Sequence, residues 1–196
     1  QRLIKQGSQV YVVFMTDGEG AYPASVIPPE ELKNRRLTLA RSAAAILGIP
    51  AENIYTMGWN DGKINETMND AAEMEALMER LKPDAVLSPH PFEGWADHVA
   101  TSQLADRLVA SCGFPVSNYK YCVWLWYSMP YDRIGKLDWK NASLLTMNSE
   151  EHRRKLHAID TYVQVDPAFG HSFSGDLPSL FVMANRWKKE LFFKKQ

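Results

Sequence analysis

The segment Lys82–His98, KPDAVLSPHPFEGWADH, decides the fold predicted for this chain. A short apolar strand centred on Val86 runs into a loop that contains proline and glycine, and a helix is expected to begin at Ala96. Asp97 and His98 lie at the start of that helix. A histidine and a carboxylate just past the carboxyl end of a strand occupy the place where α/β proteins bind ligands. The alternative is that Asp97 only caps the helix and His98 is a surface residue.

The residues before this segment, and those directly after it, alternate between strand and helix patterns. Apolar runs rich in β-branched and aromatic residues predict strands at 10–15 and 53–57. Patterns with helical spacing, bounded by proline and glycine, predict helices at 28–48, 69–81 and 96–111. This order predicts an α/β, Rossmann-like three-layer fold with a mostly parallel sheet, in which right-handed crossovers place the strand-end loops at one edge.

The second half of the chain is less regular. We predict strands at 121–127 and 142–147, a helix at 149–162 that begins at Ser149 in the manner of a capping box, and a final helix at 180–193. A loop rich in glycine, proline and serine occupies 166–179. Neither an internal repeat nor a linker is visible in the sequence, so residues 1–196 are predicted to form a single domain.

Composition excludes several classes of function. The net charge of −1 argues against a general nucleic-acid or anionic-membrane surface, and no apolar run approaches the roughly 20 residues of a membrane span. The two cysteines, Cys112 and Cys122, are too few for a disulfide scaffold and form no CxxC pair. We interpret them as free thiols, with a single disulfide as the alternative. With no secretory signal in view, the sequence predicts a cytoplasmic protein.

Polar residues that could carry chemistry follow the predicted strands. Asp17 or Glu19, Asp61 and Asp97 lie in strand-end loops, where topology would bring them together with His98. Taken singly, each carboxylate is more often a turn former or a cap. Histidine and carboxylates also bind zinc, for which His98 is the best candidate ligand.

Other catalytic patterns have little support. Thr16–Gly20 has the wrong glycine spacing for a phosphate-binding loop, and its carboxylates would repel phosphate. The chain has no GxSxG nucleophile elbow, which argues against a serine hydrolase. His90 lies between two prolines in the same loop as His98, and loops often carry function.

The chain resembles the LmbE-like, or PIG-L, family of zinc-dependent N-deacetylases, which act on N-acetylglucosamine-type groups in sugars and glycoconjugates. The matching residues come in family order and cover most of the chain. They are Val12–Glu19, Arg36, Ala44–Gly48, Asp61–Gly62, Lys82–Asp84, Asp97–Thr101, Lys155, Tyr162 and Gln164. Thr16–Glu19 and Asp97–His98 are the most distinctive of these pieces.

The resemblance implies a mechanism and a set of site residues. A zinc ion would lower the pKa of a bound water and polarise the acetyl carbonyl, with His98 as a zinc ligand and Asp97 orienting groups around it. Glu19, Arg36 and Asp61 would line the sugar pocket. Trp95 stands where many relatives have a histidine with an oxyanion or acid role. We therefore expect Trp95 to contact the substrate and His90 to act in catalysis in its place, with a different substrate class as the alternative.

The chain also departs from the family pattern. The most diagnostic motif, His-Pro-Asp-Asp-Glu, which supplies two zinc ligands and the general base, is not in these 196 residues. Because Arg2–Gly7 reads as the end of a helix, we expect the motif and the first strand to lie upstream of Gln1. Leu39 stands where the family has a glutamate.

Three functions remain open from the sequence. The first is a metal-dependent hydrolase that removes an N-acetyl or related N-acyl group from a small-molecule sugar or glycoconjugate. The second is a non-catalytic sugar-binding relative, and the third is a nucleotide-dependent Rossmann enzyme such as a methyltransferase. A homo-oligomer is compatible with each of them.

Overall fold

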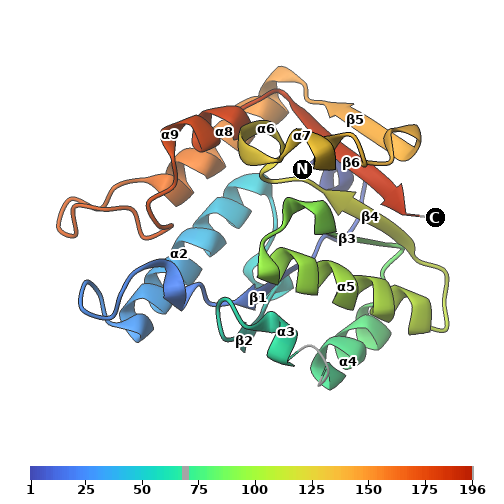
Figure 1. The fold of residues 1–196 in the computed structure, drawn as a ribbon, viewed down its shortest axis with the longest axis horizontal. Coiled ribbons are helices and arrows are strands. Elements are labelled where there is room, and N and C mark those ends of the chain that lie inside the picture. The colour runs from blue at the N-terminus through green and yellow to red at the C-terminus, as the bar shows by residue number, and fades with distance from the viewer. Residues whose placement is uncertain (68–70, 196) are drawn as a thin grey trace. The chain divides into compact units, whose positions relative to one another are not determined.

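The computed structural model describes residues 1–67 and 71–195, and Figure 1 shows its helices and strands. Contacts divide the chain into two compact units. Unit 1 consists of Gln1–Asp61 and Met147–Lys188, and unit 2 consists of Gly62–Thr146 and Lys189–Gln196. Each unit has a sheet of its own. A single domain over 1–196 stays a prediction.

Unit 1 is built around two parallel strands. β1 (Val12–Thr16) pairs with β2 (Ile54–Trp59), and α2 (Pro29–Leu47) lies between them in sequence. α2 ends at Gly48, whose φ of 89° is the left-handed conformation that glycine adopts without strain. α8 (Ser149–Val163) packs against α2. The unit's shorter elements are α1 (Arg2–Lys5), α9 (Ser179–Asn185) and the 3-10 turns Glu19–Ala21 and Ala51–Asn53.

Unit 2 contains a mixed sheet in the order β3-β4-β6-β5. β3 (Ala85–Pro89) and β4 (Ser117–Tyr121) are parallel and are joined through α5 (Ala96–Ser111). β6 (Lys189–Lys195) runs between β4 and β5 (Ala142–Thr146), antiparallel to both (Figure 1). The shorter elements are α3 (Ile64–Thr67), α4 (Ala72–Leu81), α6 (Leu125–Ser128), α7 (Tyr131–Ile134) and the 3-10 turns Pro91–Glu93 and Trp139–Asn141.

The α/β class is confirmed, and so are the helices predicted at 28–48, 96–111 and 149–162, each within about two residues. The strands predicted at 10–15, 53–57 and 142–147 are also present. The helix predicted at 69–81 corresponds to α4, and its predicted start at Asn69 lies outside the described residues. The last of these helices begins at Ser149 and has a capping box, as predicted, but the capping residue needs a correction. Asn148 is the N-cap, and Glu151 completes the capping box.

The strand predicted at 121–127 is wrong. The strand in this region is β4, which ends at Tyr121, and α6 follows it. The apolar-run criterion missed β4 because its two buried positions are polar, Asn118 and Lys120. Within the aromatic run, a helical turn places Leu125 in the core of unit 2 and leaves Trp126 partly exposed.

The helix predicted at 180–193 is wrong in its second half. α9 ends at Asn185, a turn occupies 186–188, and β6 begins at Lys189. Leu191 and Phe193 are both buried, two residues apart, which is the period of a strand with one face on a core. Backbone pairing with β4 and β5 fixes this conformation, and both partners are distant in sequence.

The structure describes the state of both cysteines and the length and apolar character of the helices. Cys112 and Cys122 are free thiols. Burial, aided by the negative charge of Glu93, raises the pKa of Cys122 to about 12, so that its thiol stays protonated at neutral pH. Within residues 1–67 and 71–195, no helix combines the length and apolar character needed to cross a membrane.

A buried lysine ties the sheet of unit 2 to α5. Lys120 of β4 donates to Ser88 Oγ of β3 at 2.8 Å and to the Ser102 carbonyl of α5 at 3.3 Å, and it forms an ion pair with Asp106 of α5 at 2.6 Å. Burial lowers the pKa of Lys120, and Asp106 opposes this shift. Asp106 also pairs with Lys195 and accepts from Asn118.

We expect the two members of the Lys120–Asp106 pair to differ in their cost of removal. Asp106→Asn leaves a charged Lys120 whose side chain is 5% exposed, and it should lower the free energy of unfolding by about 3 kcal/mol. Lys120→Met should cost about 1–2 kcal/mol, because Asp106 is 26% exposed and keeps Lys195 and Asn118. Urea unfolding followed by circular dichroism measures both values. A larger loss for Lys120→Met would contradict this account.

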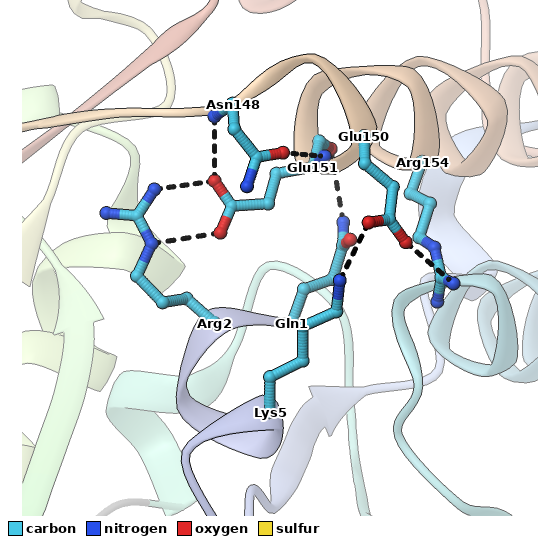
Figure 2. Close-up of polar contacts among 7 residues, drawn as sticks. All are labelled: Gln1, Arg2, Lys5, Asn148, Glu150, Glu151 and Arg154. Carbon is cyan, nitrogen blue, oxygen red and sulfur yellow. Dashed lines mark hydrogen bonds and ion pairs between the residues drawn. The ribbon is translucent and has the colours of Figure 1, made fainter.

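A second polar cluster joins the two chain segments of unit 1, close to the first residues of each. Figure 2 shows Glu151, at the start of α8, accepting hydrogen bonds from Arg2 Nε at 2.9 Å and Nη2 at 2.5 Å, and from the Asn148 backbone at 2.8 Å. Glu150 pairs with Lys5 at 2.9 Å and Arg154 at 3.1 Å. The hydrogen bonds from Arg2 and then from Asn148 lower the pKa of Glu151 to about 2.

This cluster predicts a pH-dependent contribution to stability. The pKa of Glu151 falls from 4.5 to about 2 on folding, so its contribution is fully present above about pH 4.5 and is lost as the pH falls toward 2. Glu151→Gln should therefore destabilise the protein at pH 6, and the difference from the wild type should shrink between pH 4.5 and 2.5. Urea unfolding across this range measures it. Glu73→Gln, at an exposed position of α4, is the control, and parallel pH curves for wild type and Glu151→Gln would refute the prediction.

Candidate functional site

The loop that follows β3 has a fixed conformation. His90 is the N-cap of the 3-10 turn Pro91–Glu93, and its ring Nδ1 accepts a hydrogen bond from the Phe92 amide at 3.1 Å. The turn ends at Gly94, whose φ is 80°. A Cβ at Gly94 would lie 1.9 Å from Nη1 of Arg133, the same atom that donates to the Phe92 carbonyl at 3.2 Å. The backbone conformation therefore favours glycine at this position, and any other residue would displace the guanidinium group of Arg133.

The turn places Glu93 where two hydrogen-bond donors meet. Its side chain is 0% exposed. Oε2 lies 2.7 Å from Nδ1 of His98, and Oε1 accepts from the Trp124 backbone amide at 2.6 Å. The carboxylate therefore joins the β3 loop, the first turn of α5 and the segment before α6. The His98 side chain is 28% exposed, so the ring is held at one nitrogen while part of it stays accessible.

Asp97 does not cap α5, and its carboxylate binds backbone amides of another segment. The N-cap of α5 is Trp95, and no side chain caps it. Asp97 Oδ2 instead accepts from the Gly62 amide at 2.7 Å, and Oδ1 accepts from the Ile64 amide at 3.3 Å. Its carboxylate holds the loop before α3 against the first turn of α5. The alternative in which Asp97 only caps α5 is therefore wrong.

Trp95, the N-cap of α5, presents an exposed aromatic side chain. The side chain is 53% exposed, which is unusual for tryptophan. Its ring lies 5.1 Å from that of Trp124, centroid to centroid, at an interplanar angle of 37°, and Trp124 in turn lies 6.2 Å from Tyr127. Because the Trp124 backbone is bound by Glu93, the same carboxylate positions His98 and this aromatic group.

His90 is buried next to aromatic rings. It packs edge-on against Phe92 at 5.0 Å and Phe193 at 5.4 Å between ring centroids. Burial lowers the pKa of His90, and the charge of Glu93 opposes this shift. The ring is therefore neutral at physiological pH, with Nδ1 engaged by the Phe92 amide. A catalytic role for His90 stays a prediction.

The acidic loop of unit 1 brings Glu19 and Asp61 together. Glu19 Oε1 accepts from the Asp61 amide at 2.8 Å, and Thr16 donates to Asp61 Oδ1 at 3.3 Å. A Cβ at Gly20 would lie 2.9 Å from Asp61 Oδ2, so the close approach depends on glycine. The second oxygen of Glu19 is buried without a hydrogen-bond partner in the described residues, which leaves an acceptor available.

Arg36 lies beneath the same loop. A Cβ at Gly18, which has φ 68°, would lie 2.3 Å from Arg36 Nε, and Nη1 donates to the Phe173 carbonyl at 3.0 Å. Nearby, Lys33 forms an ion pair with Asp17 at 2.6 Å. The structure thus places Arg36 against the backbone of the loop that carries Glu19. The substrate-binding roles of Glu19, Arg36 and Asp61 stay predictions.

The residues near His98 are compatible with His98 acting as one ligand of a metal ion. Zinc-binding histidines typically donate their second ring N–H to a carboxylate, and Glu93 is such a carboxylate. Over residues 1–67 and 71–195, however, no three side chains of His, Cys, Asp or Glu form a group that could hold a metal ion. The described residues therefore supply one well-oriented candidate ligand and not a complete coordination shell.

The sequence analysis missed three residues that build this site. They are Glu93, Trp124 and Arg133. Glu93 lies within Lys82–His98, and a carboxylate five residues before a candidate ligand is a usable signal. The aromatic run around Trp124 was visible in the sequence, but the bond from its backbone amide to Glu93 was not, and the packing of Arg133 on Gly94 has no sequence signal.

Comparison with known proteins supplies independent information. A family model described as "PIG-L: GlcNAc-PI de-N-acetylase" matches residues 1–109. A diacetylchitobiose deacetylase of Thermococcus kodakarensis is 27% identical over 121 residues, which cover 60% of this chain and 45% of that protein. The chain thus spans less than half the length of this curated relative.

Solved structures share the fold. The N,N'-diacetylchitobiose deacetylase from Pyrococcus horikoshii has a TM-score of 0.67 at 19% identity, over 92% of this chain and 64% of that one. The zinc-inhibited form of teicoplanin deacetylase has a TM-score of 0.66 at 11% identity, over 98% and 89%. At these identities the likeness shows the fold alone. The family model, which covers more than half of the residues, goes further, and the chain belongs to the PIG-L family of GlcNAc-PI de-N-acetylases.

Proposed function

We propose that this protein is a metal-dependent hydrolase that removes an N-acetyl or related N-acyl group from an N-acetylglucosamine-type sugar or glycoconjugate. Membership of the PIG-L family and the deacetylase activity named for its relatives support the reaction class. The observation that carries the proposal is His98, held at Nδ1 by the buried Glu93 and located just past the carboxyl end of a parallel strand.

The residues of this chain would divide the work as follows. His98 is one ligand of a divalent ion, in the first instance Zn²⁺, which when bound would supply Lewis acidity and a more acidic water. Asp97 fixes the loop at Gly62 and Ile64 against the helix that carries His98. Glu19, Asp61 and Arg36 would offer hydrogen-bonding groups to sugar hydroxyls. The catalytic role of His90 remains part of the proposal.

A second candidate function rests on the exposed aromatic surface. Trp95 and Trp124 present adjacent rings of the kind on which a sugar ring can stack. A non-catalytic sugar-binding relative would keep this surface and have no need of a metal. The two functions differ in one measurable respect, because only the hydrolase releases a free amine and a carboxylic acid from an N-acyl sugar.

The hydrolase proposal predicts that His98 is essential. In the full-length protein, His98→Ala should lower zinc content and reduce deacetylation of N-acetylglucosamine and diacetylchitobiose by at least about 100-fold, the upper end of the usual cost of losing an outer-sphere partner. Metal analysis and a fluorescent assay for the new amine measure these effects. His157→Ala, an exposed histidine on α8, is the matched control and should change neither. A wild-type protein that binds diacetylchitobiose and releases no acetate would favour the sugar-binding function instead.

The aromatic surface predicts an effect on substrate binding. Trp95→Ala should raise KM, or Kd for a non-hydrolysed sugar, by roughly 10-fold, because the loss of a stacked ring costs about 1–1.5 kcal/mol. kcat should change much less, since Trp95 would bind the sugar and not the reacting amide. Trp139→Ala, an exposed tryptophan elsewhere in unit 2, is the control. An unchanged KM for Trp95→Ala would remove Trp95 from the substrate site.

A further inference from the structure

We infer that Glu93 is a positioning residue that sets the tautomer of His98 and thereby presents Nε2 as its metal-binding nitrogen. The inference rests on the proposed metal-dependent function for its consequence, although the tautomer itself is a property of the metal-free protein. It follows from the two hydrogen bonds that Glu93 accepts and from its complete burial.

The first step concerns Oε1 of Glu93. Its partner at 2.6 Å is the backbone amide of Trp124, which can only donate. Oε1 must therefore accept. This bond also fixes the rotation of the carboxylate, because the amide lies at a set point of the backbone before α6.

The second step concerns Oε2. A carboxylate can only accept hydrogen bonds, so the 2.7 Å contact is a hydrogen bond to the carboxylate form of Glu93 only when Nδ1 of His98 carries the hydrogen. This holds whether the ring is neutral or protonated. In the neutral ring the lone pair then belongs to Nε2, which is the form that donates to a metal ion. Since the Glu93 side chain is 0% exposed, water does not compete for either oxygen.

The surrounding loop keeps Glu93 in place. His90 caps the 3-10 turn that carries it, Gly94 ends that turn, and Arg133 packs on Gly94 while bonding the Phe92 carbonyl. Each of these contacts belongs to unit 2, as does His98. The turn therefore presents the carboxylate to the first turn of α5 in a single orientation.

Glutamine at position 93 separates the positioning role from a general structural role. A glutamine side chain has one acceptor oxygen and one NH₂ donor. In Glu93→Gln the Trp124 amide should capture the oxygen, so that the NH₂ group faces Nδ1 of His98. Nδ1 must then accept, and the hydrogen moves to Nε2. The variant keeps both hydrogen bonds and the shape of the side chain, and it reverses the tautomer.

The test is long-range ¹H–¹⁵N NMR of the histidine rings in the full-length, metal-free protein, at a pH where the His98 ring is neutral. His98→Ala identifies the His98 signals. We expect hydrogen on Nδ1 in the wild type and on Nε2 in Glu93→Gln. Glu151→Gln is the matched control, since Glu151 also accepts from a backbone amide and a side chain but lies in unit 1, and it should leave the His98 signals unchanged.

A second measurement connects the tautomer to the metal. Competition with a chromophoric chelator should show zinc affinity reduced by about 10–100-fold in Glu93→Gln, and not in Glu151→Gln. Hydrogen on Nε2 of His98 in the wild type would overturn the inference, whatever the metal affinity and whether or not Glu93→Gln folds. Hydrogen on Nδ1 together with no zinc binding by the wild type would uphold the role of Glu93 in setting the tautomer and refute the proposed metal-dependent function.

Discussion

The candidate site of unit 2 depends on the two hydrogen bonds that the buried carboxylate of Glu93 makes. A buried carboxylate is stable only if its oxygens are satisfied, and here the donors are the Trp124 amide and the His98 ring. Removing either partner would leave a buried carboxyl oxygen without that hydrogen bond. The same requirement therefore locks the orientation of His98 and the backbone next to the aromatic surface, so that the two features cannot vary independently.

A buried polar network in unit 2 holds α5, the helix that carries His98, against the sheet. Lys120, on the central part of the sheet, reaches Ser88 on β3 and both Ser102 and Asp106 on α5. α5 carries His98 in its first turn, so the network fixes the helix against the sheet at a point along its length. A shift of α5 along the sheet would separate the Lys120 ammonium group from Ser102 and Asp106, so the network favours the observed packing.

Unit 1 uses a different device to shape its loop. Gly18 and Gly20 allow Arg36 and Asp61 to approach the backbone more closely than any side chain would permit. The result is a compact turn in which Glu19 bonds the Asp61 backbone and keeps one buried oxygen without a described partner. Gly18 belongs to the Thr16–Glu19 piece, which is among the most distinctive of the resemblance to the PIG-L family, and Gly20 follows directly after it. The role of both glycines is steric.

The sequence by itself determined the α/β class and the helices α2, α5 and α8. It also identified Asp97 and His98 as candidate site residues at the start of a helix. Apolar periodicity and glycine or proline boundaries are local signals, and these elements obey them. The tertiary structure alone decided that 189–195 is a strand, that Asn118 and Lys120 occupy core positions, and that Asp97 binds the Gly62 and Ile64 amides and does not cap its own helix. Each of these depends on a partner distant in sequence. The role of Glu93 belongs to the second group, because its burial and its bond to Trp124 exist only once α6 and α5 have met the β3 loop.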